Sequence, residues 1–284
     1  MAKIIELVED TEFDSDDVII KDGANGTKIM SASDFAIELA GLISPENHRN
    51  VYRGKNLGTS LTQDQIAAIQ NGTFDDLFIG DYWTINGVRY DIADMDYWYQ
   101  IGDTAFTRHH LVMISHNTMG NAKMNNTNIT TGGYIGSAMR AGYTETDPDT
   151  QEVITHDPYI KVFADRISAA FGDNLLTHRS YFSNAVSSGA ASAGAWVDST
   201  VDLMSEKMVY GTRIRGNERT VATSDKAQLA IFDLKPSEVN RPRTAQWLRD
   251  VYSATLFAGV PGNGNANPSG ASISYGVRPA FAVG

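Results

Sequence analysis

The side chains that most often carry catalysis or bind metals are few in this sequence. Its six histidines include one adjacent pair, His109–His110, which would point to opposite faces of a strand. His116, His156 and His178 lie far apart, and no H-x-x-x-H or H-E-x-x-H spacing occurs. A zinc site is therefore not expected, and we assign no metal ligands.

Paired carboxylates suggest a second chemistry, because glycosidases place two carboxyl groups across one glycosidic bond. Asp75/Asp76 and Asp94/Asp96 have the right composition. In a chain with 34 Asp and Glu residues such pairs arise by chance, and they more often serve as surface charges or turn residues. The sequence has no G-x-S-x-G elbow, P-loop or kinase motif. We therefore predict a protein that is not an enzyme and needs no cofactor.

The composition excludes further classes of protein. Cysteine is absent, so disulfides, thiolate zinc sites and cysteine nucleophiles are excluded. The net charge of −11 and a pI near 4.9 argue against a nucleic-acid partner, because phosphate backbones bind clustered Lys and Arg. No apolar run is long enough for a membrane helix, and the first residues lack the layout of a signal peptide. We expect a soluble chain without membrane insertion, made in a cytoplasm.

The C-terminal part contains the segment best suited to display side chains. Strand-like runs at residues 246–252 and 276–283 bracket residues 258–274, which are almost wholly Gly, Asn, Ser, Pro and Ala. Such residues bury little apolar area, and Gly and Asn permit positive φ. The pattern predicts a surface loop held at both ends by packed strands.

Elements upstream show clear local signals. Thr62 is placed to cap a helix, with Gln65 at the capping-box position and Asn71–Gly72 at the helix end. Asn86–Gly87 lies between two β-prone runs and predicts a hairpin. The run 97–99 (Tyr-Trp-Tyr) could stack on sugars, but at a strand end aromatic residues more often belong to the core.

Residues 158–172 form the best helix candidate in the chain. Proline begins the segment and glycine ends it. The apolar residues expected on its buried face are Ile160, Val162, Phe163, Ile167 and Phe171.

The N-terminal segment differs from the rest in charge and size. Residues 1–50 contain eleven acidic residues against four basic ones. Asn25–Gly26 predicts a hairpin, and the following segment predicts a short helix carrying Phe35, Ile37, Leu39 and Leu42. So small a unit buries little core alone. We predict an attachment or oligomerisation module at residues 1–45 and a larger domain at residues 46–284, with a ligand-display region at 247–284.

Several segments together resemble a known family. They are NVYRGKNLGT, FIGDYWTINGVRYDIADMDYW, GGYIGSAMR, LLTHR, DLMSEKMVYG, WLRD (247–250) and GVRPAF (276–281). The set resembles the C-type-lectin-like domains of phage and gut-bacterial proteins, which include relatives of the formylglycine-generating fold and the target proteins of diversity-generating retroelements. The DGxNGTK stretch near the N-terminus resembles the N-terminal segments of tailed-phage fibre and receptor-binding proteins. The resemblance implies an α+β fold with small antiparallel sheets, two or so helices and long irregular loops.

The resemblance also implies roles for individual residues. In diversified relatives the ligand-contacting side chains lie between the two C-terminal signatures. On this chain the corresponding ligand-binding candidates are Tyr252, Phe257, Val260, Asn263, Asn265, Asn267, Ser269, Ser272, Ser274 and Tyr275.

Four signature residues are assigned structural roles instead. Trp247 is expected in the core, and Arg249 and Arg278 are expected to pair with buried carboxylates such as Asp250 or Asp202.

Two departures from the family limit the chemistry. The EPN, QPD and WND strings of calcium-dependent sugar-binding lectins do not occur, so a calcium-dependent monosaccharide site is not expected. Formylglycine-generating enzymes need redox-active cysteines, and this chain has none.

These observations predict a phage virion protein, a tail fibre or receptor-binding adhesin, that binds a host-cell-surface protein or glycan through its C-terminal region. Other virion proteins are expected to bind the N-terminal module. A homo-oligomer is expected, with a trimer favoured, because multivalent display strengthens a weak contact. A structural virion component, such as a capsid decoration or head-fibre protein, is the alternative, and an enzyme acting on cell-wall glycans is a third possibility. The protein is expected in the virion after synthesis in the host bacterial cytoplasm.

Overall fold

The computed structural model describes residues 18–23, 26–31, 45–183, 186–187, 190–191, 194–216, 228–241 and 243–284. The chain divides into two compact units, residues 1–47 and residues 48–284. The expected helix with Phe35, Ile37, Leu39 and Leu42 lies outside the described residues. Among the described residues, no helix is both long and apolar enough to cross a membrane.

The first unit contains the hairpin that its sequence predicts. Strands β1 (Val18–Gly23) and β2 (Gly26–Ser31) pair antiparallel, with Val18 opposite Ser31 and Gly23 opposite Gly26. Ile29 on β2 is 73% exposed. This unit therefore offers an apolar side chain to solvent on a two-stranded ribbon.

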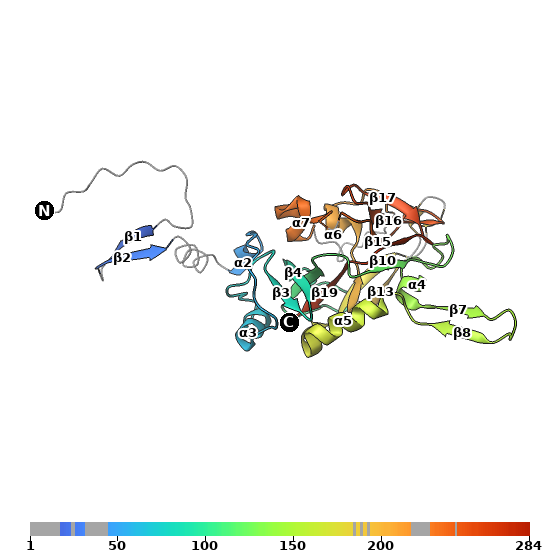
Figure 1. The fold of residues 1–284 in the computed structure, drawn as a ribbon, viewed down its shortest axis with the longest axis horizontal. Coiled ribbons are helices and arrows are strands. Elements are labelled where there is room, and N and C mark those ends of the chain that lie inside the picture. Colours follow the sequence, from blue (N-terminus) through green and yellow to red (C-terminus); the bar gives the residue numbers. More distant parts are fainter. Residues whose placement is uncertain are drawn as a thin grey trace. The chain divides into compact units, whose positions relative to one another are not determined.

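A six-stranded sheet forms the centre of the second unit (Figure 1). Its strands follow the order β14-β19-β5-β4-β3, and the short β9 also pairs with β19. All of its strand pairs are antiparallel. The bounds are β3 Tyr82–Ile85, β4 Val88–Met95, β5 Leu111–Ser115, β9 Leu175–Leu176, β14 Val201–Leu203 and β19 Pro279–Val283.

A second sheet has five strands in the order β17-β16-β15-β18-β6. The β15–β18 pair is parallel, and the other pairs are antiparallel. Four of its strands come from the last forty residues of the chain. The bounds are β6 Asn121–Lys123, β15 Gln246–Val251, β16 Leu256–Val260, β17 Asn267–Gly270 and β18 Ser274–Gly276.

Short hairpins and helices complete the unit. The hairpin of β7 (Tyr143–Thr146) and β8 (Val153–His156) extends away from the rest of residues 48–284 (Figure 1). The other two-stranded pairs are β10 (His178–Ser183) with β13 (Gly194–Ser199) and β11 (Val186–Ser187) with β12 (Ala190–Ala191). The helices are α3 Gln63–Gln70, α4 Ala138–Ala141, α5 Lys161–Phe171, α6 Glu206–Tyr210, α7 Ala230–Leu234, η1 Gly172–Asn174 and η2 Pro236–Glu238. The short helix α2, Pro45–His48, spans the boundary between the two units in the sequence.

The capping box at the start of α3 is confirmed in full. The backbone amide of Gln65 donates to the Thr62 hydroxyl (3.2 Å), and the Thr62 amide donates to Oε1 of Gln65 (3.0 Å). Asn71 ends the helix, and Gly72 follows it with a φ of 69°. The hairpin at Asn86–Gly87 is also confirmed, with φ values of 50° and 77° that suit a tight β-turn.

Helix α5 forms within residues 158–172, as predicted. Phe163, Ile167 and Phe171 are buried on one face. The prediction was wrong for Val162, which is 51% exposed. The buried positions repeat every four residues, and position 162 lies off that stripe.

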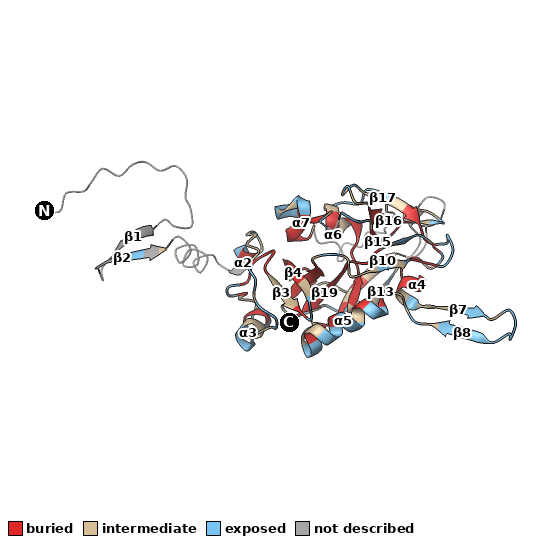
Figure 2. Ribbon diagram, in the orientation of Figure 1, coloured by how far each residue is buried: buried red, intermediate tan, exposed pale blue. Residues whose placement is uncertain are grey.

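Two hydrophobic clusters fill the second unit. Figure 2 shows buried residues on strands of both sheets. The larger gathers residues of the first sheet with α5, α6 and α7, and the smaller gathers residues around Trp247, Phe257 and Phe182. Consecutive residues of β15 enter different clusters, because Trp247 joins the smaller one and Leu248 the larger. The unit is thus a mixed α+β fold in which β15 separates two cores.

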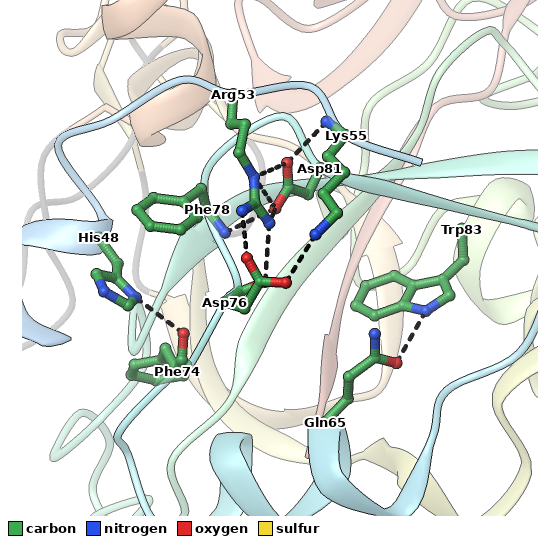
Figure 3. A network of polar contacts seen from close by, with 9 residues as sticks. All are labelled: His48, Arg53, Lys55, Gln65, Phe74, Asp76, Phe78, Asp81 and Trp83. Carbon is green, nitrogen blue, oxygen red and sulfur yellow. Dashed lines mark hydrogen bonds and ion pairs between the residues drawn. The ribbon is translucent and has the colours of Figure 1, made fainter. Parts of the chain in front are cut away.

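A buried carboxylate fixes the beginning of the second unit to the first sheet (Figure 3). Asp81 is fully buried and accepts hydrogen bonds from the Arg53 guanidinium, from the backbone amide of Lys55 (2.8 Å) and from the amide of Phe78 (3.0 Å). Arg53 also pairs with Asp76, and its guanidinium carbon lies 4.4 Å from the centroid of the Phe78 ring. Burial raises the pKa of Asp81, which the Arg53 charge opposes. We interpret this network as structural.

Candidate functional site

The C-terminal display region is built differently from the predicted single loop. The bracketing strands are present as β15 and β19. The prediction of one surface loop at residues 258–274 was wrong, because the end of β16 and all of β17 lie within it. Only the β16–β17 and β17–β18 connections are irregular. The segment is therefore part of a sheet.

The ten ligand-binding candidates differ in exposure. Four are exposed: Asn263, Asn265, Asn267 and Ser274. Three are partly buried: Tyr252, Ser272 and Tyr275. Three are buried, so the prediction that they contact a ligand at the surface was wrong: Phe257, Val260 and Ser269. The buried residues are strand residues of β16 and β17, whose side chains pack against the protein interior.

Hydrogen bonds hold the partly buried candidates in place. The Ser269 hydroxyl donates to the Tyr275 hydroxyl (2.7 Å), and the Ser272 hydroxyl donates to Oδ1 of Asn128 (2.8 Å). Tyr275 packs on Trp247 with ring centroids 4.7 Å apart. Trp247 is fully buried, as predicted, and its Nε1 donates to a backbone carbonyl of β6 (2.9 Å). The exposed residues thus lie on a base that is fixed by packing and hydrogen bonds.

Arg278 also helps to hold the C-terminal region in place. It is fully buried, and it donates from Nε to the carbonyl of Ser115 (2.8 Å) and from Nη1 to the carbonyl of Glu238 (2.8 Å). Burial lowers the pKa of Arg278 to about 10, although the nearby Asp91 and Glu238 carboxylates favour the charged form. Arg278 therefore joins β5 and η2 to the segment between β18 and β19.

The predicted pairing of the two signature arginines was wrong. Among the described residues, neither Arg249 nor Arg278 forms an ion pair with Asp202 or Asp250. Asp202 instead accepts from Nε of Arg140 (2.9 Å). Asp250 accepts from the first backbone amide of α6 (2.6 Å). Arg140 thus occupies Asp202, and neither oxygen of Asp250 accepts a hydrogen bond from Arg249.

Arg249 lies over an aromatic ring. Its guanidinium carbon is 4.5 Å from the centroid of the Phe182 ring. Nε is buried and has no hydrogen-bond partner. In the part of the chain that the structure describes, no carboxylate lies within ion-pair distance of it. An arginine in this condition has unused hydrogen-bond donors.

Arg249 lines a narrow pocket of about 20 Å³, which we call the aromatic–basic pocket. Its principal residues are Trp98, Arg179, Tyr181, Trp196, Lys207 and Arg249. They come from the segment after β4, from β10 and β13, from α6 and from β15. No acidic residue is among those that line it.

The wall formed by Trp98 is held by two histidines. The Trp98 ring stacks on His178 with centroids 3.7 Å apart, and its backbone amide donates to Nε2 of His110 (3.1 Å). His178 is buried, and neither of its ring nitrogens has a hydrogen-bond partner. Burial holds the pKa of His178 well below its usual range, and the nearby His110 and Arg249 act in the same direction. Tyr97 and Trp98 are core residues as predicted, but Trp98 also lines the pocket.

One cluster of metal-ligating side chains exists within the described residues. Asp91, His116 and Glu238 place their ligand atoms within 4.8 Å of one another. Asp91 accepts from Nε of Arg89 (2.7 Å) and Nδ1 of His116 (2.6 Å), and Glu238 accepts two bonds from Arg241 (2.5 and 2.6 Å). Since arginines already occupy these carboxylates, we interpret the cluster as an ion-pair network.

The sequence signals for the pocket were incomplete. The 97–99 run is aromatic, and Arg249 belongs to the WLRD signature. Arg179 and Lys207 lie in the segments LLTHR and DLMSEKMVYG, which carry the resemblance, but neither residue was predicted to bind a ligand. Trp196 has no signal in its own segment. Alternation along β15 offered one usable signal, since Arg249 lies two residues from the buried Trp247 and therefore on the same side of the strand.

Comparisons with known proteins identify no relative. No family model, no curated protein and no solved structure matches this chain.

Proposed function

We propose that this chain is a C-type-lectin-like phage virion protein, a tail fibre or receptor-binding adhesin, that binds a host-cell-surface ligand through its C-terminal region. One observation carries the proposal. Asn263, Asn265, Asn267 and Ser274 are exposed, while neighbouring residues of the same sheet are buried. Short polar side chains on a fixed base can be exchanged without disturbing the core, which suits ligand recognition.

The geometry narrows the proposed contact surface. It comprises the four exposed residues, with the partly buried Tyr252, Ser272 and Tyr275 at its border. Phe257 and Val260 are buried in the smaller and the larger core, and Ser269 is buried in β17. The proposed ligand is a surface protein or glycan that offers hydrogen-bonding groups to amide and hydroxyl side chains.

The test is binding to host cells by purified protein. A variant with Asn263→Ala, Asn265→Ala, Asn267→Ala and Ser274→Ala should bind at least about tenfold more weakly, because several hydrogen bonds are removed together. The matched control is Lys161→Gln, which changes an exposed residue of α5. Equal binding by the fourfold variant and the control would overturn the proposed binding surface.

Association of several chains belongs to the proposal. A homotrimer held by residues 1–47 would multiply a weak contact. The exposed Ile29 on β2 supports a role for this unit in contacts with other chains. Light scattering on the whole chain and on a chain without residues 1–47 measures the molar mass and so the number of associated chains. A monomer in both cases would contradict the proposed oligomer.

A second candidate is a structural virion component, such as a capsid decoration or head-fibre protein. The β7–β8 hairpin favours it, because Val153 and Ile154 are exposed on a projecting ribbon. In that case Val153→Ser with Ile154→Ser should reduce incorporation into particles and leave cell binding unchanged. Electron microscopy of labelled particles would then place the protein on the capsid rather than the tail.

A further inference from the structure

We propose that the aromatic–basic pocket binds the carboxylate of an acidic saccharide, with Arg249 as the residue that receives the carboxylate. This proposal deepens the proposed function and rests on it only in taking the ligand to be a cell-surface glycan. None of the four exposed residues of the C-terminal region lines this pocket.

The first argument is the charge of the pocket. Arg179, Lys207 and Arg249 line it without any acidic residue, in a chain whose net charge is −11. Arg179 is neutralised by Asp103 and Asp198, which pair with it at 2.8 and 2.9 Å. Arg249 has no such carboxylate among the described residues. Arg249 is therefore the lining residue whose charge an entering anion could neutralise.

The second argument is the state of the Arg249 side chain. Its buried Nε lacks a hydrogen-bond partner, which costs free energy unless a ligand supplies an acceptor. Stacking over Phe182 fixes the plane of the guanidinium. A guanidinium with fixed orientation is suited to a carboxylate, whose oxygen can accept a charge-assisted hydrogen bond from it.

The size of the pocket limits what can enter. Its volume of about 20 Å³ holds little more than one water-sized group. A carboxylate could therefore enter with one oxygen, and the bulk of the ligand must remain outside. A phosphate could also insert one oxygen, so the experiment includes a phosphate as a competing probe.

Aromatic side chains at the pocket could bind the part of the ligand that stays outside it. Tyr181 and Trp196 face each other across β10 and β13, with ring centroids 5.6 Å apart, and both are partly exposed. Trp98 forms a further wall. Aromatic rings offer apolar faces on which a sugar ring can stack while its hydroxyls remain in water. A carboxylate attached to a sugar ring satisfies both the charged and the aromatic parts of the pocket.

The experiment uses the whole chain and three small probes: methyl β-glucuronide, methyl β-glucoside and glucose 6-phosphate. Ligand-observed NMR or calorimetry measures their affinities. We expect the glucuronide to bind at least about tenfold more tightly than the glucoside, because a charge-assisted hydrogen bond is lost in the neutral sugar. Equal affinity for the two would overturn the proposal. Equal or tighter binding of the phosphate would overturn the assignment to a carboxylate.

Variants identify the residue responsible. Arg249→Gln should lower the affinity for the glucuronide at least about tenfold, and Arg249→Lys should recover part of it. Lys161→Gln removes one exposed charge elsewhere and should leave the affinity unchanged. Equal losses in Arg249→Gln and Lys161→Gln would overturn the role of Arg249.

A second variant covers the case in which Arg249→Gln does not fold. Trp196→Ala changes a partly exposed pocket residue and should weaken glucuronide binding, whereas unchanged binding would overturn the proposed stacking. Because these assays measure binding of a free saccharide without cells, their outcome is independent of the host-cell test. Loss of cell binding in the fourfold C-terminal variant with intact glucuronide binding would separate the two sites.

Discussion

The ring of His178 lies against the ring of Trp98, with centroids 3.7 Å apart and planes inclined by 22°. This contact places a titratable group in the interior without a hydrogen-bond partner for either nitrogen. Its pKa is held well below the usual value, chiefly by burial. The neutral ring is therefore the form that the folded protein favours.

Stability should depend on pH through this residue. In the unfolded chain His178 takes up a proton as the pH falls below about 6.5, whereas the folded protein resists it. The free energy of unfolding should therefore fall between about pH 7 and pH 5. His178→Phe keeps a ring against Trp98 and should make this fall smaller, as urea unfolding at several pH values would show.

The matched control for this prediction is His156→Phe, because His156 lies on the exposed β7–β8 hairpin beside Glu145. It should leave the pH dependence of wild-type stability nearly intact. An unchanged pH dependence in His178→Phe would show that the buried imidazole is not responsible.

Two carboxylates that bind Arg53 should differ in their contribution to stability. Asp81 is fully buried and accepts several hydrogen bonds, whereas the side chain of Asp76 is 57% exposed. Asp81→Ala should cost about 3 kcal/mol, because it leaves buried donors unsatisfied. Asp76→Ala should cost about 1 kcal/mol or less. Chemical denaturation measures the free energy of unfolding of both variants. Equal losses would contradict the larger structural role that we assign to Asp81.

Loss of the capping box of α3 should reduce the free energy of unfolding by a smaller amount. Thr62→Ala removes the hydroxyl that accepts from the Gln65 amide and should cost about 1 kcal/mol. Ser168→Ala, at an exposed position within α5, should change stability by less than about 0.5 kcal/mol. Thermal unfolding would reveal the difference, and similar midpoints for the two variants would argue against the cap.

Substitutions in the C-terminal region should fall into two groups by their effect on the free energy of unfolding. Phe257→Ala creates a cavity in the smaller core and should cost about 3–5 kcal/mol. Asn267→Ala changes an exposed position on β17 and should cost less than about 0.5 kcal/mol. Denaturant unfolding of both variants measures this, and a large loss for Asn267→Ala would show that it supports the fold instead of displaying a side chain.

Local chemistry explains which elements could be predicted from the sequence. The Thr62 capping box and the Asn86–Gly87 hairpin depend on residues close in the chain, so their signals are complete in the sequence. Strand β17 was missed because its residues, Asn267–Gly270, have low β-propensity and include a proline. The strand forms at the edge of its sheet, where Pro268 opposite Ala258 loses no required ladder bond. Pairing with β16 determines its structure.

The aromatic–basic pocket could not be predicted for a different reason. Trp98, Tyr181 and Arg249 lie on segments that only the fold brings together. The expected pairing of Arg249 with Asp202 failed because Arg140 occupies this carboxylate. Competition among distant donors for the same acceptor has no signature within a single segment.

The position of β19 has a consequence for how the protein is made. This strand pairs with both β14 and β5 inside the first sheet, yet its residues, Pro279–Val283, follow all the other strands in the chain. During synthesis on a ribosome the sheet therefore stays divided until these residues emerge, and its closure joins segments that are far apart in sequence. Until then β5 and β14 each present an unpaired edge. A nascent or truncated chain would therefore be prone to aggregate with other chains through these two edges.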